Sequence, residues 1–310
     1  MHSPAQRRSS TDADAERPYR ALLLPAAGYR PCSDEGRQLP AAVEAYIKTG
    51  GGGKTVQRIL EAVGAFVLTH LANIGRVTLL YGETIRQVTR RLRVRSIIYQ
   101  MAHLGADSLL IVGLTLLFTG VVLTLQIAHE FIRYGAQSTV GAVIAIGIGR
   151  ELGPVLVGVV CAGRVGAAIT AEVSTMKVTE QIDALRVMAV SPVNYLIVPR
   201  MLACMVVVPI LTVFGDVIGV LGGYLTAVYY SGISAYTFTN SITQFALIYD
   251  MTGGLIKAIF FGNVIAVLGC HYGLNAPSGA EGVGKATMHT VVTSIIVIFI
   301  LNAVLTFFLF

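Results

Sequence analysis

Apolar residues are gathered into long stretches along the chain, and four of these stretches contain no Asp, Glu, Lys or Arg. They cover residues 108–128, 217–249, 258–280 and 290–310. A helix needs about 20 mostly apolar residues to cross a bilayer, so each stretch is long enough. None alternates apolar and polar residues as the strands of a membrane barrel do. Because backbone groups in lipid must satisfy their hydrogen bonds internally, the pattern predicts membrane-spanning helices.

The expected fold is therefore an all-α membrane protein with five transmembrane spans. One further span covers a mostly apolar region that carries Arg150 and Glu151. The five spans are expected at about 105–128, 138–165, 196–228, 251–272 and 288–310.

The region before the first span has a different pattern. Residues 56–99 place apolar residues at helical spacing with polar residues between them, and arginines crowd the end of this region. These arginines are Arg86, Arg90, Arg91, Arg93 and Arg95. An amphipathic helix with a basic end is typical of a helix that lies in the membrane interface. Residues 1–55 are rich in proline, polar residues and glycine, which predicts a disordered tail and a linker before a domain at 56–310.

The linker contains GGGGKT (Gly50–Thr55), which is similar to a phosphate-binding loop. That motif needs a glycine where this chain has Lys48, and it needs an apolar strand before it. Neither requirement is met, so we expect the chain to lack a nucleotide site of its own.

Composition indicates the class of protein, and the distribution of charge predicts how the chain is oriented in the membrane. The chain is 54% hydrophobic and 13% charged, and its mean hydropathy is +0.70, which is typical of a membrane protein. Of the 23 Lys and Arg residues, 15 precede Leu104, so the positive-inside rule predicts a cytoplasmic N-terminus. Five spans then place the C-terminus outside. The four cysteines and six histidines lack the spacing of metal ligands, so no metal site is expected.

The segment TAEVSTMKVTEQIDALRVM (170–188), between the second and third spans, is unusually rich in charge. Its apolar residues recur at helical spacing while the charges cover other faces, and Pro192 is expected to end the helix. These apolar residues are Val178, Ile182, Leu185 and the following Ala189. A short amphipathic helix on the cytoplasmic side is either a solvated connector or a docking surface for a partner. The pattern alone does not choose between them.

Four ionisable residues fall inside predicted spans: Arg150, Glu151, Asp216 and Lys257. A charge at the middle of a bilayer costs at least about 2.5–3.5 kcal/mol, so such residues usually face protein or a wet cavity. Adjacent residues on a helix do not face each other, so Arg150 and Glu151 each need another partner. Lys257 and Asp216 are the candidates. By contrast, Arg164 and Arg200 lie where spans meet the cytoplasm, and we expect them to extend to lipid headgroups.

Glycines four residues apart recur in two of the spans. Small residues at this spacing let helix backbones approach closely in lipid. The expected packing glycines are Gly149 and Gly153 in the second span, and Gly215, Gly219 and Gly223 in the third. The sequence does not say whether they join helices within one chain or across a dimer.

Several blocks of sequence follow one another in a distinctive order. They are R-E-L-G-P (Arg150–Pro154), A-G-R-x-G (Ala162–Gly166), A-E-x-x-x-M-x-x-T-E-Q (Ala171–Gln181) and P-R (Pro199–Arg200). With these blocks, the chain from about residue 56 to its end resembles the MlaE/YrbE family, the permease subunits of MCE-type lipid ABC transporters. The family also includes the plastid permease that moves lipid into chloroplasts.

This resemblance implies a homodimeric permease in the bacterial inner membrane, with the plastid inner envelope as the second possibility. The expected partners are a dimer of cytoplasmic ABC ATPases and an MCE-domain protein on the outer side, with a phospholipid as substrate and no nucleic acid. ATP and Mg²⁺ are then bound by the ATPase, and this chain is a transporter subunit that binds no cofactor and is not an enzyme.

The resemblance also assigns roles to residues. The segment at about Thr170–Ala189 corresponds to the family's coupling helix, which favours docking over a solvated connector. The residues expected to contact the ATPase are Glu172, Met176, Lys177, Glu180, Gln181, Asp183, Leu185 and Arg186. Arg150, Glu151 and Lys257 match polar positions near the family's lipid site. Our hypothesis is that Glu151 and Lys257 line or gate a lipid cavity, and that Arg150 and Asp216 support them.

Two other classes of protein fit the sequence less well. Asp216 and Asp250 are similar to the aspartates of intramembrane proteases, but that motif needs a glycine where this chain has Val213, and the two motifs are in reversed order. A secondary transporter usually has two related halves, whereas five spans cannot be halved and no internal repeat is visible.

Overall fold

The computed structural model describes residues 55–88 and 94–310. Within these ranges every regular element is helical, and five helices are long and apolar enough to cross a membrane. They are Val94–Arg133, Gln137–Val178, Val193–Tyr229, Ile248–Leu274 and Ala280–Leu309. The predicted all-α class and the five predicted spans are confirmed.

The chain divides into two compact units at Gly82 and Glu83. The described part of the first unit belongs to one helix, α3 (Thr55–Val88), which continues into the start of the second unit. The helix expected over 56–99 therefore ends at Val88, and residues 94–99 belong to the first span instead. The predicted tail, the glycine-rich linker and Arg90, Arg91 and Arg93 lie outside the described residues. The position of α3 in the membrane interface stays a prediction.

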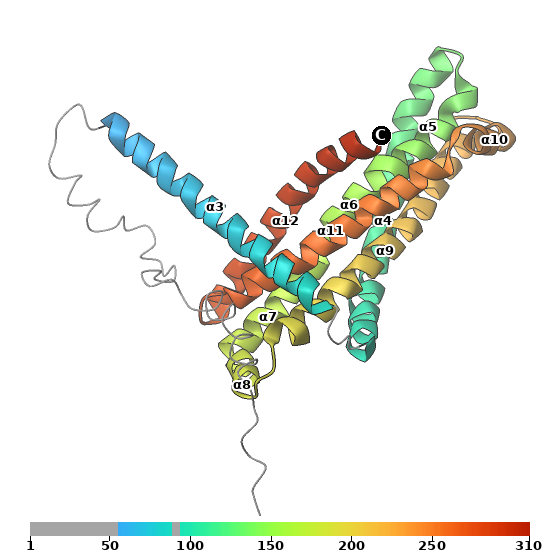
Figure 1. Ribbon diagram of the computed structural model, residues 1–310. Coiled ribbons are helices and arrows are strands. Elements are labelled where there is room, and N and C mark those ends of the chain that lie inside the picture. Colours follow the sequence, from blue (N-terminus) through green and yellow to red (C-terminus); the bar gives the residue numbers. More distant parts are fainter. Residues whose placement is uncertain (1–54, 89–93) are drawn as a thin grey trace, which may run out of the picture. The chain divides into compact units, whose positions relative to one another are not determined.

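The spans of the second unit are built from several consecutive helical segments. The first span is α4 (Val94–Arg133). The second joins η2 (Gln137–Thr139), α5 (Val140–Gly147), η3 (Ile148–Leu152), α6 (Gly153–Cys161), η4 (Ala162–Gly166) and α7 (Ala167–Val178). The short α8 (Gln181–Val187) leads to the third span, η5 (Val193–Ile197) with α9 (Val198–Tyr229). Then follow α10 (Ala235–Phe245), α11 (Ile248–Leu274) and α12 (Ala280–Leu309). In this second unit, α7 and α8 lie at the end opposite α5 and α10 (Figure 1).

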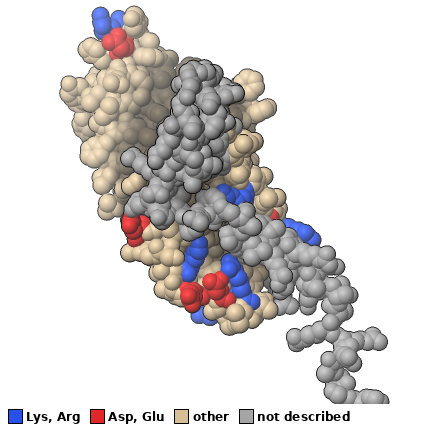
Figure 2. Space-filling model, turned by 90° about the vertical axis from the view of Figure 1, so that its left-hand side faces the viewer, with Lys and Arg blue, Asp and Glu red and all other residues tan. Residues whose placement is uncertain are grey.

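The helices are longer than the spans read from hydropathy. The second span was expected to end at 165, but the helix continues through α7 to Val178. Hydropathy identifies only the part of a helix that is apolar enough for lipid. The helical backbone hydrogen bonds continue beyond that part into the polar segment, so the helix is longer than the predicted span. On the face drawn in Figure 2, visible charged side chains lie at the top and in the lower part, with uncharged surface between them. This distribution fits a helical unit with an apolar middle.

Glycines bring α4 and α9 into backbone contact. A Cβ atom on Gly120 would lie 1.9 Å from the carbonyl oxygen of Gly219, and one on Gly223 would lie 2.8 Å from Oγ1 of Thr124. The nearest atom to a Cβ on Gly215 would be Cγ of Leu116, at 3.1 Å. The three glycines of the third span therefore face α4 of the same chain, and close approach of two helices is how small residues favour association in lipid.

We predict that Gly120→Ala destabilises the protein, because its new methyl group must push α4 away from the Gly219 carbonyl. Overpacking of this kind costs about 1–3 kcal/mol or more, so the temperature of thermal unfolding in detergent should fall. Gly147→Ala is the matched control, since no atom lies within 4 Å of its added Cβ. Equal unfolding temperatures for the two variants would contradict the contact.

Candidate functional site

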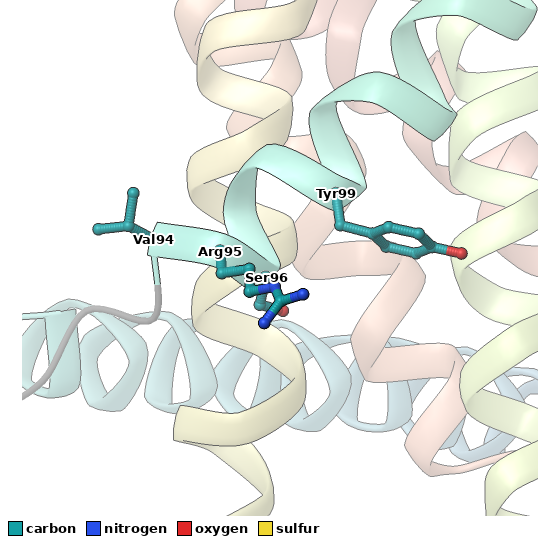
Figure 3. A pocket seen from close by; sticks show the side chains of 4 residues that line it. All are labelled: Val94, Arg95, Ser96 and Tyr99. Carbon is teal, nitrogen blue, oxygen red and sulfur yellow. The ribbon is translucent and has the colours of Figure 1, made fainter.

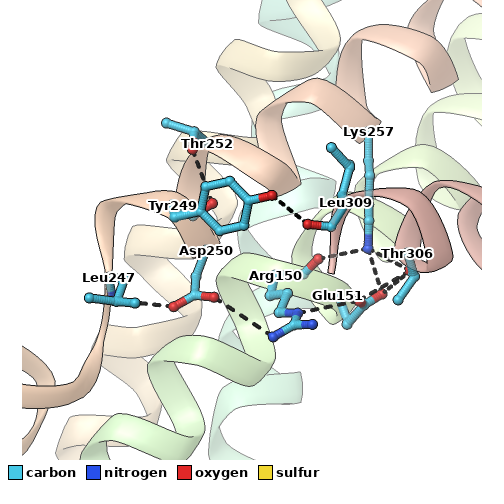
Figure 4. A network of polar contacts seen from close by, with 9 residues as sticks. All are labelled: Arg150, Glu151, Leu247, Tyr249, Asp250, Thr252, Lys257, Thr306 and Leu309. Atoms are coloured by element: carbon cyan, nitrogen blue, oxygen red, sulfur yellow. Dashed lines mark hydrogen bonds and ion pairs between the residues drawn. The ribbon is translucent and has the colours of Figure 1, made fainter.

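A cluster of charged and polar side chains joins η3, α11 and α12 inside the second unit (Figure 4). At its centre, Nζ of Lys257 lies 2.8 Å from Oε2 of Glu151. Nζ also donates to the carbonyl oxygen of Arg150 at 3.1 Å and to Oγ1 of Thr306 at 2.8 Å. The Lys257 side chain is 0% exposed, so its three donors are all used within the protein.

Glu151 is held by neighbours other than Lys257. Its Oε2 accepts a hydrogen bond from Nδ2 of Asn302 at 3.3 Å, and its carboxylate accepts from Oγ1 of Thr306 at 3.2 Å. Thr306 thus accepts from the ammonium group and donates to the carboxylate. A buried charge is tolerated when it is both paired and hydrogen-bonded, and this ion pair meets both conditions.

The R-E-L-G-P block explains how the second span supplies this site. Proline has no backbone N–H, so Pro154 cannot bond the carbonyl of Arg150 in α-helical register, and that carbonyl accepts from Lys257 instead. The segment that ends two residues before Pro154 is the π-helical η3, a type of segment that is frequent at functional sites. Gly254 lets α11 approach η3, because a Cβ on it would lie 2.1 Å from the Gly149 carbonyl oxygen.

Arg150 is the charged residue of the cluster whose donors are least occupied. Its guanidinium lies 3.8 Å from Oδ1 of Asp250 and 3.9 Å from Oε1 of Glu151, which is beyond hydrogen-bond distance. Its Cζ lies 3.5 Å from the centre of the Phe310 ring, a cation–π contact. The side chain is 33% exposed, and among the described residues no hydrogen bond to its five N–H groups is formed. Arg150 can therefore donate hydrogen bonds to an anion without breaking an existing hydrogen bond.

Asp250 supplies the carboxylate nearest to the Arg150 guanidinium, at 3.8 Å. It lies in the first turn of α11, is 8% exposed, and accepts a hydrogen bond from the backbone N–H of Leu247 at 3.2 Å. A carboxylate is favourable there because it faces the positive end of the helix dipole. The signal in the sequence was its spacing, since Asp250 and Lys257 are two helical turns apart and share a face.

The structure does not bring Asp216 into the cluster. This residue of α9 is buried, and a Cβ on Gly153 would lie 1.8 Å from its Oδ1. Within the described part of the chain, Oδ1 has no hydrogen-bond partner, and no ion pair joins Asp216 to Arg150 or Glu151. Asp216 therefore fills the space that Gly153 leaves open. The contacts with Arg150 and Glu151 that were expected of Asp216 are made by Asp250, Asn302 and Thr306 instead.

The segment between the second and third spans consists of two helices rather than one. α7 and α8 meet at Glu180, which has φ 59°, and α8 ends before Ala189, which has φ 57°. The Val190 N–H bonds to the Leu185 carbonyl at 3.0 Å, so the helix closes in a Schellman motif with alanine in the usual glycine position. Pro192 was expected to end this helix, but the backbone turns three residues before it.

The surface of α8 also differs from the expected apolar strip. Ile182 is buried and fixes the helix to its own protein, whereas Val187 is 88% exposed and Met188 is 62% exposed. Most residues expected to contact the ATPase are accessible: Glu172, Glu180, Gln181, Asp183 and Arg186 are exposed, and Met176, Lys177 and Leu185 are partly so. An exposed apolar pair beside the Asp183–Arg186 ion pair fits a docking surface.

Two arginines at this end behave differently from each other. Arg164 is half exposed and lies 3.5 Å from the carboxylate of Asp107. Arg200 is 3% exposed and lies 2.8 Å from Oε1 of Glu172, so the expectation that it extends to headgroups is wrong. The reason is that a carboxylate on α7 offers the guanidinium a partner within the protein.

Elsewhere, an open hollow lies at the start of α4, lined by Val94, Arg95, Ser96 and Tyr99. The four side chains point in different directions and do not converge on one point (Figure 3). Among residues 55–88 and 94–310, no group of three or more His, Cys, Asp or Glu side chains is placed to hold a metal ion. The cluster around Lys257 is the stronger candidate site.

Five helices long and apolar enough to cross a membrane, three of which an ionic cluster joins, define a multi-pass membrane protein with a polar site between its spans. Residues 97–308 match the family described as Permease MlaE. A probable ABC transporter permease protein of Rickettsia typhi is 39% identical over 258 residues, covering 83% of this chain and 96% of the relative. A second, from Synechocystis, is 43% identical over 220 residues, covering 71% and 84%.

A plant protein is also similar to the chain. The chloroplastic protein TRIGALACTOSYLDIACYLGLYCEROL 1 of Arabidopsis thaliana is 35% identical over 235 residues, covering 76% of this chain and 67% of the relative. The chain belongs to the MlaE permease family, which confirms the resemblance seen in its sequence blocks. It is an ABC transporter permease, a transporter subunit rather than an enzyme, and such a permease works in a membrane with an ATPase partner.

We predict that the two charges of the central ion pair are energetically coupled. Glu151→Gln leaves the fully buried Lys257 without a counter-charge, a loss that costs up to about 3–5 kcal/mol. The double variant Glu151→Gln/Lys257→Met removes the stranded charge and should unfold at a higher temperature than Glu151→Gln alone. Thermal unfolding in detergent measures this. Additive effects of the two substitutions would show that the groups do not interact.

Proposed function

We propose that the chain is the membrane subunit of an ATP-driven lipid transporter whose substrate is a phospholipid or a related lipid. The observation that carries the proposal is Arg150, a partly exposed cation with unoccupied donors inside a bundle of apolar helices. A lipid phosphate offers what a guanidinium fork recognises, and the surrounding apolar surface suits acyl chains. The name of the Arabidopsis relative is that of a galactolipid, which supports a lipid as cargo.

The proposal divides the charged cluster into two parts. Glu151 and Lys257 form a saturated ion pair that fixes η3, α11 and α12 relative to each other. Arg150, backed by Asp250 and covered by Phe310, contacts the headgroup. Our sequence-based hypothesis gave the contacting role to Glu151 and Lys257, and the unoccupied donors of Arg150 favour exchanging these roles.

The assembly that we propose is a homodimer with two ATPases at the α7–α8 end and an MCE-domain protein at the other end. Exposed Val187 and Met188, flanked by Asp183 and Arg186, support docking of the ATPase on α8. The positive-inside rule supports a cytoplasmic position for that end. ATP and Mg²⁺ belong to the ATPase. The bacterial relatives favour the inner membrane, and the chloroplastic relative keeps the plastid envelope as the alternative.

We predict that Arg150→Gln lowers the amount of phospholipid that co-purifies with the native complex, measured by mass spectrometry of the extracted lipids. Removing a charge-assisted contact worth about 1.5–3 kcal/mol should reduce occupancy at least several-fold. Arg133→Gln is the matched control, because Arg133 is an exposed arginine at the end of α4. Unchanged lipid in the Arg150 variant would refute a headgroup contact, and absence of lipid from the wild-type complex would refute the substrate class.

We also predict that Val187→Glu prevents co-purification of the ATPase while the permease still folds. The substitution places a charge in the apolar part of the proposed docking surface, where desolvating it opposes binding. Tyr230→Glu is the control, since Tyr230 is 80% exposed at the far end of α9. The measurement is the ratio of ATPase to permease after affinity purification, and an equal ratio for both variants would exclude α8 as the docking site.

A further inference from the structure

An ion pair with a buried guanidinium links α7 to the first turn of α9. Nη2 of Arg200 lies 2.8 Å from Oε1 of Glu172, and the Arg200 side chain is 4% exposed. Nη1 of Arg200 donates to the carbonyl of Leu196 at 2.9 Å, within its own span, and Nε is buried without a hydrogen-bond partner. Among the described residues, Glu172 is therefore the carboxylate that neutralises this buried guanidinium.

The other face of α7 is fixed to the fourth and fifth spans. Oγ1 of Thr170 donates to the carbonyl oxygen of Gly269 at 3.2 Å and shares a hydrogen bond of 2.8 Å with Oγ1 of Thr290. Nζ of Lys177 donates to the carbonyl of Ala276 at 2.9 Å, in the connection between α11 and α12. α7 packs closely on α11 and α12, so these three helices form one packed group.

The third span is attached to this group mainly through α11, on which α9 packs closely, rather than through α7. Close packing joins α8 to α7, but the α7–α9 pair does not pack to the same extent. From α8 to α9 the chain runs through Ala189, in its left-handed conformation, and through the π-helical η5. The Glu172–Arg200 ion pair bypasses this connection and ties the first turn of α9 directly to α7.

We propose that Glu172 is a positioning residue whose ion pair with Arg200 transmits displacement of α8 and α7 to the third span. This inference rests on the proposed docking of the ATPase at α8. It changes the part assigned to Glu172, which the sequence placed among the ATPase contacts. The carboxylate acts inside the permease, and its charge is required because a buried guanidinium binds a carboxylate much more strongly than a neutral amide.

The test uses the intact complex of permease, ATPase and MCE-domain protein in proteoliposomes that contain fluorescent phosphatidylglycerol. Glu172 is about half exposed, so Glu172→Gln is expected to fold, which a substitution at buried Arg200 does not ensure. We expect Glu172→Gln to bind the ATPase and hydrolyse ATP at nearly the wild-type rate. The lipid moved per ATP hydrolysed should fall about tenfold, within the usual range of coupling between two sites.

Glu281→Gln is the matched control, because Glu281 forms an exposed ion pair with Lys285 at 2.7 Å in the first turn of α12. It should leave the lipid moved per ATP unchanged. The inference is overturned if Glu172→Gln keeps the wild-type ratio, or if transport and hydrolysis fall in proportion, as they would for damage to folding alone. A wild-type permease that binds no ATPase would contradict the proposed function itself, and the inference with it.

Discussion

The ammonium group of Lys257 has no exposed surface, and much of the site follows from the need to neutralise it. A cation in this position requires a carboxylate and further acceptors within reach. Glu151 supplies the charge, Thr306 supplies a hydroxyl, and the Arg150 carbonyl becomes available because Pro154 cannot bond to it. Residues of three separate spans are thereby held together. The same arrangement leaves the guanidinium of Arg150 at the edge of the cluster, with unoccupied hydrogen-bond donors.

Sequence patterns predicted the helical class and the five spans because hydropathy depends on composition over about 20 residues and tolerates local error. They also singled out Arg150, Glu151 and Lys257, since a charge within a long apolar stretch is costly and needs an explanation. Asp216 met the same criterion and lies outside the cluster. Its carboxyl group lies against Gly153, and a packing relation between two spans leaves no trace in either span alone.

The remaining features depend on geometry that no local pattern carries. Asn302 and Thr306 are ordinary helix residues by sequence, and they contact Glu151 only because α12 lies beside η3. From its position in the sequence, Arg200 is expected to extend to the lipid headgroups. Only the structure shows that it pairs with Glu172 of another helix. The turns at the two ends of α8 were hidden as well, because neither Glu180 nor Ala189 is a glycine, although both have the backbone conformation that favours one.

That last feature has a mechanical consequence. A side chain restricts the backbone at a left-handed position far more than glycine does, so the joints at both ends of α8 are strained and stiff rather than loose. Seven residues of helix measure about 10 Å, which makes α8 a short rigid arm with a fixed angle to α7. Because neither joint bends easily, a force on α8 would be passed to α7 rather than absorbed between the two helices.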